Sequence, residues 1–412
     1  MGSASREVWS AGANQLSDTL PFATDILVAA AAGLAVLIAA RLSEWVRVPS
    51  SVLVLAASAV AISVAPGVHH PPQTLVERIV TVALVAVLFS GGMGMGRGRF
   101  RAATVPILVL GVAGTFATAA LAAFFVHFAL GFNWYVSFLL GTAVAPTDPT
   151  VVFSVLGQRR VAGRSGAILE GESGANDPVG IALMAGLIGA HALSVSGLGH
   201  VATTFAIQMA VGSAVGVAGG VALLWLIRHL PLPGQGLHPI RTLVASFLLY
   251  GTATVAHGSG FLAVFVAGIV IGDQRAPHKG EIEDFHAALG SLGEMAAFVA
   301  LGLTVPLSSL GHLDVWGPGL ALGLVLATII RPLVVLVCLI RVRLPVSERR
   351  FVQFAGLKGA VPILLGGYLL STSLTNAERL YGIVIIVVVF SVAVQGGLVD
   401  AAIKSVKLPL ER

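Results

Sequence analysis

The segment Ala145-Pro146-Thr147-Asp148-Pro149-Thr150 interrupts a strongly apolar stretch that runs from about residue 133 to 157. Each of its two prolines lacks the N–H that would bond the carbonyl four residues earlier in a helix. The carbonyls of Thr142 and Ala145 are therefore left without helical partners. The sequence predicts a helix that is broken in its middle.

A second segment of this kind is Gly356-Leu357-Lys358-Gly359-Ala360-Val361-Pro362, within the apolar residues 350–370. Two glycines weaken the helix here, and Pro362 frees the carbonyl of Lys358. Irregular backbone inside an apolar span is tolerated only where protein or a wet cavity surrounds it. Two such breaks favour a transport protein.

The composition places the whole chain in a lipid bilayer. Of its 412 residues, 56% are hydrophobic and 10% are charged, whereas soluble domains carry about 25% charged residues. The lone cysteine, Cys338, excludes an internal disulfide and a multi-thiolate zinc site. The sequence has no P-loop, nucleophile elbow or zinc-ligand spacing, so we expect neither an enzyme nor a bound cofactor.

Apolar stretches long enough to cross a bilayer predict an all-α polytopic membrane protein with about thirteen transmembrane helices. They lie near residues 25–44, 50–66, 76–95, 104–129, 133–157, 164–191, 201–228, 240–256, 259–272, 286–308, 318–340, 350–370 and 380–403.

The basic residues indicate the orientation. Most of the 24 Lys and Arg residues fall in alternate loops, and the opposite loops hold only Arg6, Arg78 and Arg379. Because basic loops stay in the cytoplasm, we expect the N-terminus outside and the C-terminus inside the plasma (inner) membrane of a prokaryote. The net charge of +5 is then a topology signal, and we expect no nucleic-acid partner.

The two breaks suggest inverted repeats. They fall in the fifth and twelfth predicted spans, an odd offset, so the two halves have opposite orientations in the membrane. The expected organisation is a polar N-terminal tail (1–24), a first repeat (25–191), a linker helix (201–228), a second repeat (240–403) and a short cytoplasmic tail (404–412).

Six charged side chains lie near the middle of predicted spans, where each costs several kcal/mol and is rarely kept without a use. They are Asp148, Glu172, Asp177, Glu294, Arg331 and Lys358.

The sixth span gathers oxygen atoms on one side. On a helix, Glu172 and Asn176 stack at i, i+4, and so do Ser173 and Asp177. Carboxylate, hydroxyl and amide oxygens suit a hard monovalent cation. One carboxylate can hold either a proton or a metal ion but not both, and this competition is the minimal chemistry of an antiporter.

Three motifs together resemble the sodium/proton exchanger branch of the monovalent cation:proton antiporter superfamily. They are Thr147-Asp148-Pro149, Glu172-Ser173 followed by Asn176-Asp177, and the segment 356–362. The resemblance covers residues 25–403, and the sequence is also similar to bacterial potassium/proton antiporters. It implies an elevator-type fold, usually homodimeric, in which a core of spans 4–6 and 11–13 moves against a dimerising scaffold.

The resemblance also assigns roles at the cation and proton site. Asp177 would alternate between H+ and the cation, with Asn176 marking the Asn-Asp subtype, which resembles electroneutral exchangers. Thr147 and Ser173 would add oxygens to the monovalent metal ion, here Na+ or K+. Asp148 would balance the helix-end dipoles in the crossing.

The remaining charges receive supporting roles. Glu172 would pair with Arg331 and hold Asn176 in place, and Lys358 would neutralise the carbonyl end of a half-helix. Glu294 is a further candidate. The chain departs from the family pattern at Ser90, where an acid is common, and at Lys358, which is frequently Arg.

Other interpretations stay open at this point. Asp148 could cap the half-helix after its break, and the Glu172–Arg331 pair could be purely structural. Asp177 could have a purely structural role, as a carboxylate neutralised by an unidentified basic side chain. For function, the alternative is a cation-coupled symporter of a small organic anion on a similar inverted-repeat fold.

Overall fold

The computed structural model describes residues 50–64, 71–149, 164–190, 194–305, 312–372 and 374–406 continuously, with isolated positions between and beyond them. The regular secondary structure of these residues is helical, apart from a two-residue strand pair, β1 (Arg160–Val161) antiparallel to β2 (Leu410–Glu411). Nearly all of the predicted tail 1–24 and most of the predicted first span lie outside the described residues.

The α-helices and the π-helical segments (η) follow one another along the chain. In order they are α2 (Ser50–Val64), α3 (Gln73–Leu108), η1 (Val109–Gly114), α4 (Thr115–Leu130), α5 (Trp134–Ala143), α7 (Ser165–Ala190), α8 (Val195–His229), α9 (Leu237–Val255), α10 (Gly260–Gly272), α11 (Lys279–Gly302), α13 (Leu313–Val325), η2 (Leu326–Ile330), α14 (Arg331–Cys338), α15 (Val346–Phe354), α16 (Ala360–Leu370), α17 (Ala377–Phe390), η3 (Ser391–Gln395) and α18 (Val399–Val406).

Five helical stretches among the described residues are long and apolar enough to cross a membrane: Gln73–Leu130, Val195–His229, Lys279–Gly302, Leu313–Cys338 and Ala377–Gln395. Shorter apolar helices accompany them, among them α2, α10 and α16. These lengths and compositions are those of an integral membrane protein.

Two of the predicted spans, residues 76–95 and 104–129, follow each other in one long helical stretch, Gln73–Leu130, which a kink divides into two helices. Gly96 and Ala103 leave helical geometry at the kink, and Gly96 has a φ of 61°. A glycine adopts this φ without steric cost, so the chain turns between the two helices without a long loop.

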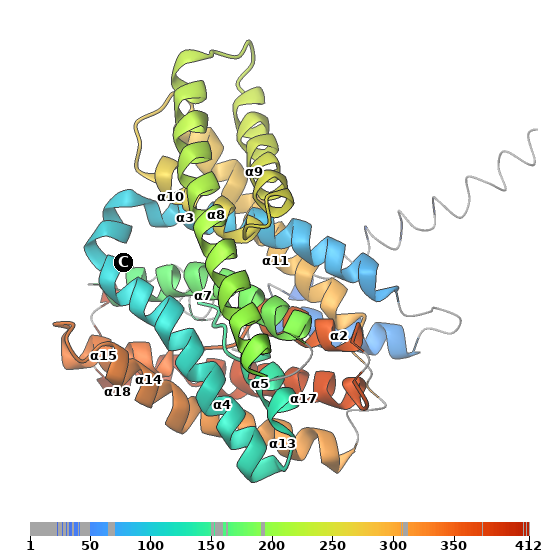
Figure 1. The fold of residues 1–412 in the computed structure, drawn as a ribbon. Coiled ribbons are helices and arrows are strands. Elements are labelled where there is room, and N and C mark those ends of the chain that lie inside the picture. The colour runs from blue at the N-terminus through green and yellow to red at the C-terminus, as the bar shows by residue number, and fades with distance from the viewer. Residues whose placement is uncertain are drawn as a thin grey trace, which may run out of the picture.

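The helices pack as two groups (Figure 1). In one, α3 packs against α10 and α11, and α8 and α9 pack against each other and against α10. In the other, α4 packs on α5, while α17 contacts α13, α16 and α5. Helix α7 lies between the groups and touches α3 and α8 on one side and α5, α15 and α16 on the other.

Helix α7 is buried on all sides over its middle. Every residue from Gly171 to Gly180 is buried, including the polar ones. Close approach to the first break depends on Gly180, because a Cβ there would lie 2.6 Å from Cγ of Pro146. A helix that is buried all round belongs to the interior of the fold.

Candidate functional site

The first break follows a short helix. Helix α5 begins after Asn133, whose side chain accepts a hydrogen bond from the N–H of Val136 at 2.9 Å, and it ends at Ala143. Residues 144–149 are not helical. The structure thus confirms the interruption that Pro146 and Pro149 predict.

The second break separates α15 from α16, and residues 355–359 are not helical. The two broken segments cross each other, and the N–H of Asp148 donates a hydrogen bond to the carbonyl of Leu357 at 2.8 Å. The crossing therefore joins two backbone groups that have no helical partner, as buried peptide groups require.

Lys358 brings a positive charge to the end of the first half-helix. Its Nζ donates to the carbonyls of Ala145 at 3.0 Å and Pro146 at 3.1 Å, and the side chain is buried. The C-terminal end of a helix carries a partial negative charge, so an ammonium group is stabilised there. This is the position that the resemblance implies for Lys358.

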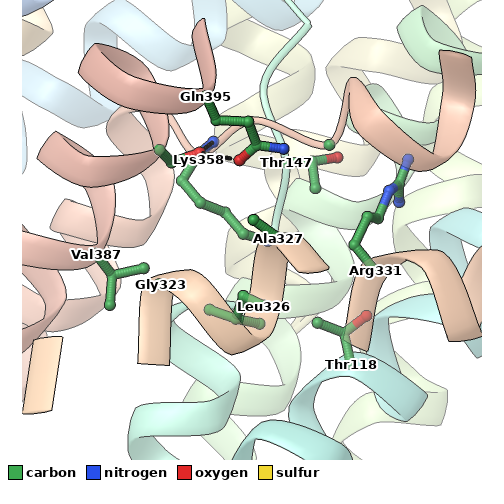
Figure 2. A pocket seen from close by; sticks show the side chains of 11 residues that line it. Thr118, Thr147, Gly323, Leu326, Ala327, Arg331, Lys358, Val387 and Gln395 are labelled. Carbon is green, nitrogen blue, oxygen red and sulfur yellow. Dashed lines mark hydrogen bonds between the residues drawn. The ribbon is translucent and has the colours of Figure 1, made fainter. Parts of the chain in front are cut away.

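A small cavity borders Lys358 (Figure 2). It has room for about one water molecule, and it lies beside the two π-helical segments η2 and η3. The polar side chains in its wall are Thr118, Thr147, Arg331, Lys358, Ser391 and Gln395.

Asp148 lies at the N-terminal end of the other half-helix. It is half-buried, and its side chain packs against Gly359, directly before α16. The partial positive charge of a helix N-terminus stabilises a carboxylate. Each break thus supplies a charge that complements a helix end in the other. The residues that would form a half-helix after the first break lie largely outside the described part of the chain.

Replacing Gly359 with Ala is expected to destabilise the protein. The added Cβ would overlap the carboxylate and Cβ of Asp148, and Cβ of Asp148 is too close to the backbone to move aside easily. Overpacking of this kind costs about 1–3 kcal/mol. The measurement is the thermal unfolding temperature in detergent. Gly397→Ala is the matched control, because a Cβ at Gly397 meets no atom within 4 Å; equal unfolding temperatures for the two variants would contradict the crowding.

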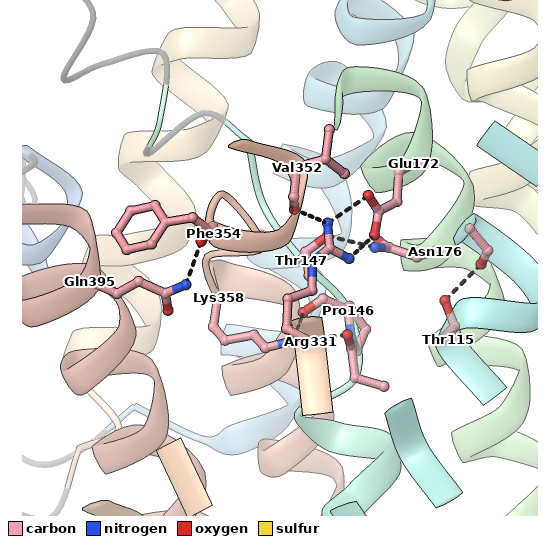
Figure 3. Close-up of polar contacts among 12 residues, drawn as sticks. Thr115, Pro146, Thr147, Glu172, Asn176, Arg331, Val352, Phe354, Lys358 and Gln395 are labelled. Atoms are coloured by element: carbon pink, nitrogen blue, oxygen red, sulfur yellow. Dashed lines mark hydrogen bonds and ion pairs between the residues drawn. The ribbon is translucent and has the colours of Figure 1, made fainter. Parts of the chain in front are cut away.

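Arg331 and Glu172 form a buried ion pair with two hydrogen bonds (Figure 3). Nη1 of Arg331 bonds Oε1 of Glu172, and Nη2 lies 2.9 Å from Oε2. Nη2 also donates to the carbonyl of Val352 in α15 at 3.0 Å. The guanidinium therefore links α7, which carries Glu172, to the helix that leads into the second break.

Asn176 connects α7 to the first break. Its Nδ2 donates to Oγ1 of Thr147 at 2.8 Å, whereas its Oδ1 is buried and has no hydrogen-bond partner among the described residues. A buried acceptor without a partner costs free energy. A cation bound to this oxygen would supply the missing partner.

Asp177 follows Asn176, and it is buried with 9% of its surface exposed. Within the described residues, no side chain forms an ion pair or hydrogen bond with its carboxylate. Lys358 is a described basic side chain whose charge acts on Asp177, but its Nζ is hydrogen-bonded to the carbonyls of Ala145 and Pro146. Ser173, one turn earlier on α7, is also buried.

Together these groups can bind a monovalent cation through oxygen atoms. The carboxylate of Asp177 would supply the negative charge, Asn176 and Ser173 lie within about one turn of it on α7, and Thr147 is hydrogen-bonded to Asn176. The same carboxylate can take up a proton instead, which makes the two ligands competitors.

Glu294 belongs to a different part of the fold. It is half-buried in α11, a helix that packs mainly on α2, α3 and α9. Glu294 has a polar or electrostatic partner of its own. Its helix is not one of those that form the crossing.

The structure adds residues that the sequence analysis did not select. Oε2 of Glu348 accepts hydrogen bonds from the N–H groups of Arg164 and Ser165, both at 2.9 Å, and so caps the start of α7. Ser391 and Gln395 contact the second break. An i, i+4 pair of polar residues in an apolar span was a usable signal for Ser391 and Gln395.

Comparison with known proteins finds one family over most of the chain. The family model described as "Sodium/hydrogen exchanger, transmembrane" matches residues 32–404. This range contains both breaks, α7 and Arg331.

Two curated relatives are similar over most of this chain. The K(+)/H(+) antiporter NhaP of Alkalimonas amylolytica is 33% identical over 335 residues, which are 81% of this chain and 58% of the relative. The K(+)/H(+) antiporter NhaP2 of Shewanella sp. (strain ANA-3) is 31% identical over 84% of this chain and 60% of the relative. The chain thus spans about three fifths of the length of the curated relatives it matches.

A solved structure shares the fold. The sodium proton antiporter MjNhaP1 from Methanocaldococcus jannaschii at pH 8 superposes with a TM-score of 0.75 at 20% identity, over 92% of this chain and 97% of that one. The family match covers most of the sequence, and the broken helices and buried charges of the crossing lie within it. This chain therefore belongs to the sodium/hydrogen exchanger family of transmembrane cation:proton antiporters.

Proposed function

We propose that this protein is a secondary antiporter that exchanges Na+ or K+ for H+ across the membrane by alternating access. Asp177 carries either the proton or the cation, with Asn176, Thr147 and Ser173 as oxygen ligands. Asp148 and Lys358 balance the helix ends of the crossing, and the Glu172–Arg331 pair holds α7. Na+, K+ and H+ are cargo, and the transport needs no resident cofactor.

One observation carries this proposal above the others. The Asp177 carboxylate is buried beside the crossing and forms no ion pair among the described residues. Lys358, whose charge acts on it, has its Nζ bonded to the carbonyls of Ala145 and Pro146 instead. A bare carboxylate in that environment is costly, so binding of a proton or a cation stabilises it. The names of the relatives, antiporters of K+ or Na+ with H+, agree with that chemistry.

We further propose one-for-one, electroneutral exchange. Asn176 stands beside Asp177 where a second acid would add another titratable group. A single carboxylate that exchanges one H+ for one monovalent cation moves no net charge. The rate should then be independent of an imposed membrane potential.

We propose which helices move during transport from the way the helices pack in two groups. A core of α4, α5, α7 and α13–α18 would move against a scaffold of α2, α3 and α8–α11, in an elevator motion. The proposed inverted repeats are residues 25–191 and 240–403, with 201–228 as the linker. We also propose thirteen spans, a homodimer, and a prokaryotic plasma membrane with the C-terminus in the cytoplasm.

The test is cation-induced collapse of a pH gradient in proteoliposomes, with Na+, K+ and Li+ supplied separately. We expect at least one of these cations to release the gradient, at the same rate with and without an imposed membrane potential. The proposal would be refuted by a protein that thermal unfolding shows to be folded but that moves protons with none of the three cations.

A further inference from the structure

Two polar residues of the last long helix are not used by the site described above. Helix α17 continues into the π-helical segment η3, which begins at Ser391 and ends at Gln395. Both side chains are buried, and Oγ of Ser391 donates to Oε1 of Gln395 at 3.1 Å. Short π-helical segments frequently occur at functional sites, and buried polar groups are kept where they have partners.

The hydrogen bonds of these residues form a directed chain. Nε2 of Gln395 donates to the carbonyl of Phe354 at 2.6 Å, so its Oε1 is the atom that faces Ser391. Ser391 uses its hydrogen on Gln395, and its oxygen accepts from the backbone N–H of Lys358 at 3.0 Å. Since a carbonyl only accepts and an N–H only donates, the direction of every bond is fixed.

The chain begins and ends on the second break. Phe354 is the last residue of α15, and Lys358 lies two residues before α16. Their peptide groups lack helical partners, and an unpaired peptide group buried in a membrane protein costs several kcal/mol. Ser391 and Gln395 supply both partners from one side, while Asp148 bonds Leu357 from the other.

Packing alone does not confine Lys358. The small cavity borders its side chain together with Ser391 and Gln395 (Figure 2). Empty space next to a side chain leaves it free to move unless hydrogen bonds hold it. The backbone bond to Ser391 is therefore a restraint that keeps Nζ of Lys358 on the carbonyls of Ala145 and Pro146.

The first break is held in a comparable way. Asn176 lies in α7, the predicted span after the first broken span, and donates its side-chain amide to Thr147 within the first break. Gln395 lies in η3, in the predicted span after the second broken span, and donates its side-chain amide to Phe354 (Figure 3). A carboxamide from the next predicted span thus restrains each broken segment.

We propose that Ser391 and Gln395 are positioning residues for cation exchange, which act by fixing the second break so that Lys358 stays at the crossing. This inference rests on the proposed antiport function. Neither residue contacts the cation. Their effect on transport reaches Asp177 through Lys358, whose charge lies in the same crossing.

The test compares Ser391→Ala, Ser391→Thr, Gln395→Met and the control Val394→Ala in proteoliposomes. Val394 lies on the same segment with 48% of its surface exposed, so its truncation should change nothing. Loss of one hydrogen bond should change the apparent KM for the cation about three- to tenfold in Ser391→Ala and Gln395→Met. The pH of half-maximal rate should shift with it, and Ser391→Thr, which keeps the hydroxyl, should restore both values.

A purely structural role predicts a different result. Loss of folded protein lowers the maximum rate and the unfolding temperature but leaves KM and the pH midpoint unchanged, and this outcome would overturn the inference. The inference would also be overturned if Ser391→Ala and Gln395→Met both had the KM and the pH midpoint of the wild type. Wild-type protein that exchanges no cation refutes the proposed function instead, so the two failures are distinguishable.

A double-mutant cycle tests the route through Lys358. The measured quantity is the cation concentration that gives half of the maximal thermal stabilisation in detergent, which requires no transport. Ser391→Ala should change this concentration in the wild type and have no further effect in a Lys358→Met background, because residues that act through one another are not additive. Equal effects in the two backgrounds would show that Ser391 acts independently of Lys358 and would overturn the inference.

Discussion

Asp177→Asn is expected to abolish cation-dependent proton release from proteoliposomes while leaving the protein folded. Asn has nearly the same size and shape as Asp, so the packing of α7 should be kept. It neither takes up a proton nor offers a negative charge to a cation, and both steps of the exchange are lost. The rate with Na+, K+ or Li+ should fall to that of liposomes without protein.

The same variant makes a prediction about stability. Neutralising a buried carboxylate that has no described ion-pair partner removes a desolvation cost, so the unfolding temperature should be equal to or above that of the wild type. It should also no longer rise when cation is added. Asp314→Asn is the matched control, since Asp314 is an exposed acid paired with Arg379; its exchange rate should stay close to that of the wild type. Retained exchange in Asp177→Asn would remove Asp177 from its proposed role.

Arg331→Ala should cause a large loss of stability. The truncation leaves the carboxylate of Glu172, which is 2% exposed, without its cation and without its two hydrogen bonds. Breaking a buried ion pair by removing one partner costs about 3–5 kcal/mol. The carbonyl of Val352 loses its donor as well. The measurement is the unfolding temperature in detergent, which should fall by many degrees.

Two further variants separate the buried charge from simple loss of side-chain volume. Arg379→Ala removes an exposed partner of Asp314, and exposed pairs contribute about 0–1 kcal/mol, so its unfolding temperature should hardly change. Combining Arg331→Met with Glu172→Gln removes the unpaired charge and should recover part of the stability lost in Arg331→Ala. An unchanged unfolding temperature for Arg331→Ala would show that the ion pair does not stabilise the fold.

Both broken helices were predictable from local chemistry. Pro146, Pro149 and Pro362 lack the N–H of a helical hydrogen bond whatever surrounds them, so the interruptions of α5 and of α15–α16 follow from the sequence. The buried charges were predictable for a similar reason, because Asp177 and Lys358 stand in apolar stretches where each is costly. The resemblance to known exchangers then paired Glu172 with Arg331, which the structure brings together.

Other residues gave no such signal. Glu348 stands in the polar segment Ser347-Glu348-Arg349-Arg350, which looks like a solvated helix end. Only its packing against the start of α7 reveals that it is a buried cap. Similarly, the sequence separates residues 76–95 and 104–129 by a basic segment, and only the structure shows that the two helices meet at a kink with Gly96 and Ala103 in non-helical geometry.

The sequence by itself predicted that the chain is a membrane protein, where two of its helices break, and that a carboxylate in the polar segment 172–177 could hold either a proton or a cation. These properties depend on composition and on neighbours within a few residues. The tertiary structure alone decided that Lys358 binds the carbonyl of Ala145, 213 residues away, and that Ser391 and Gln395 hold the second break. Contacts of this kind depend on how distant helices cross and on their register, which hydropathy and proline positions do not specify.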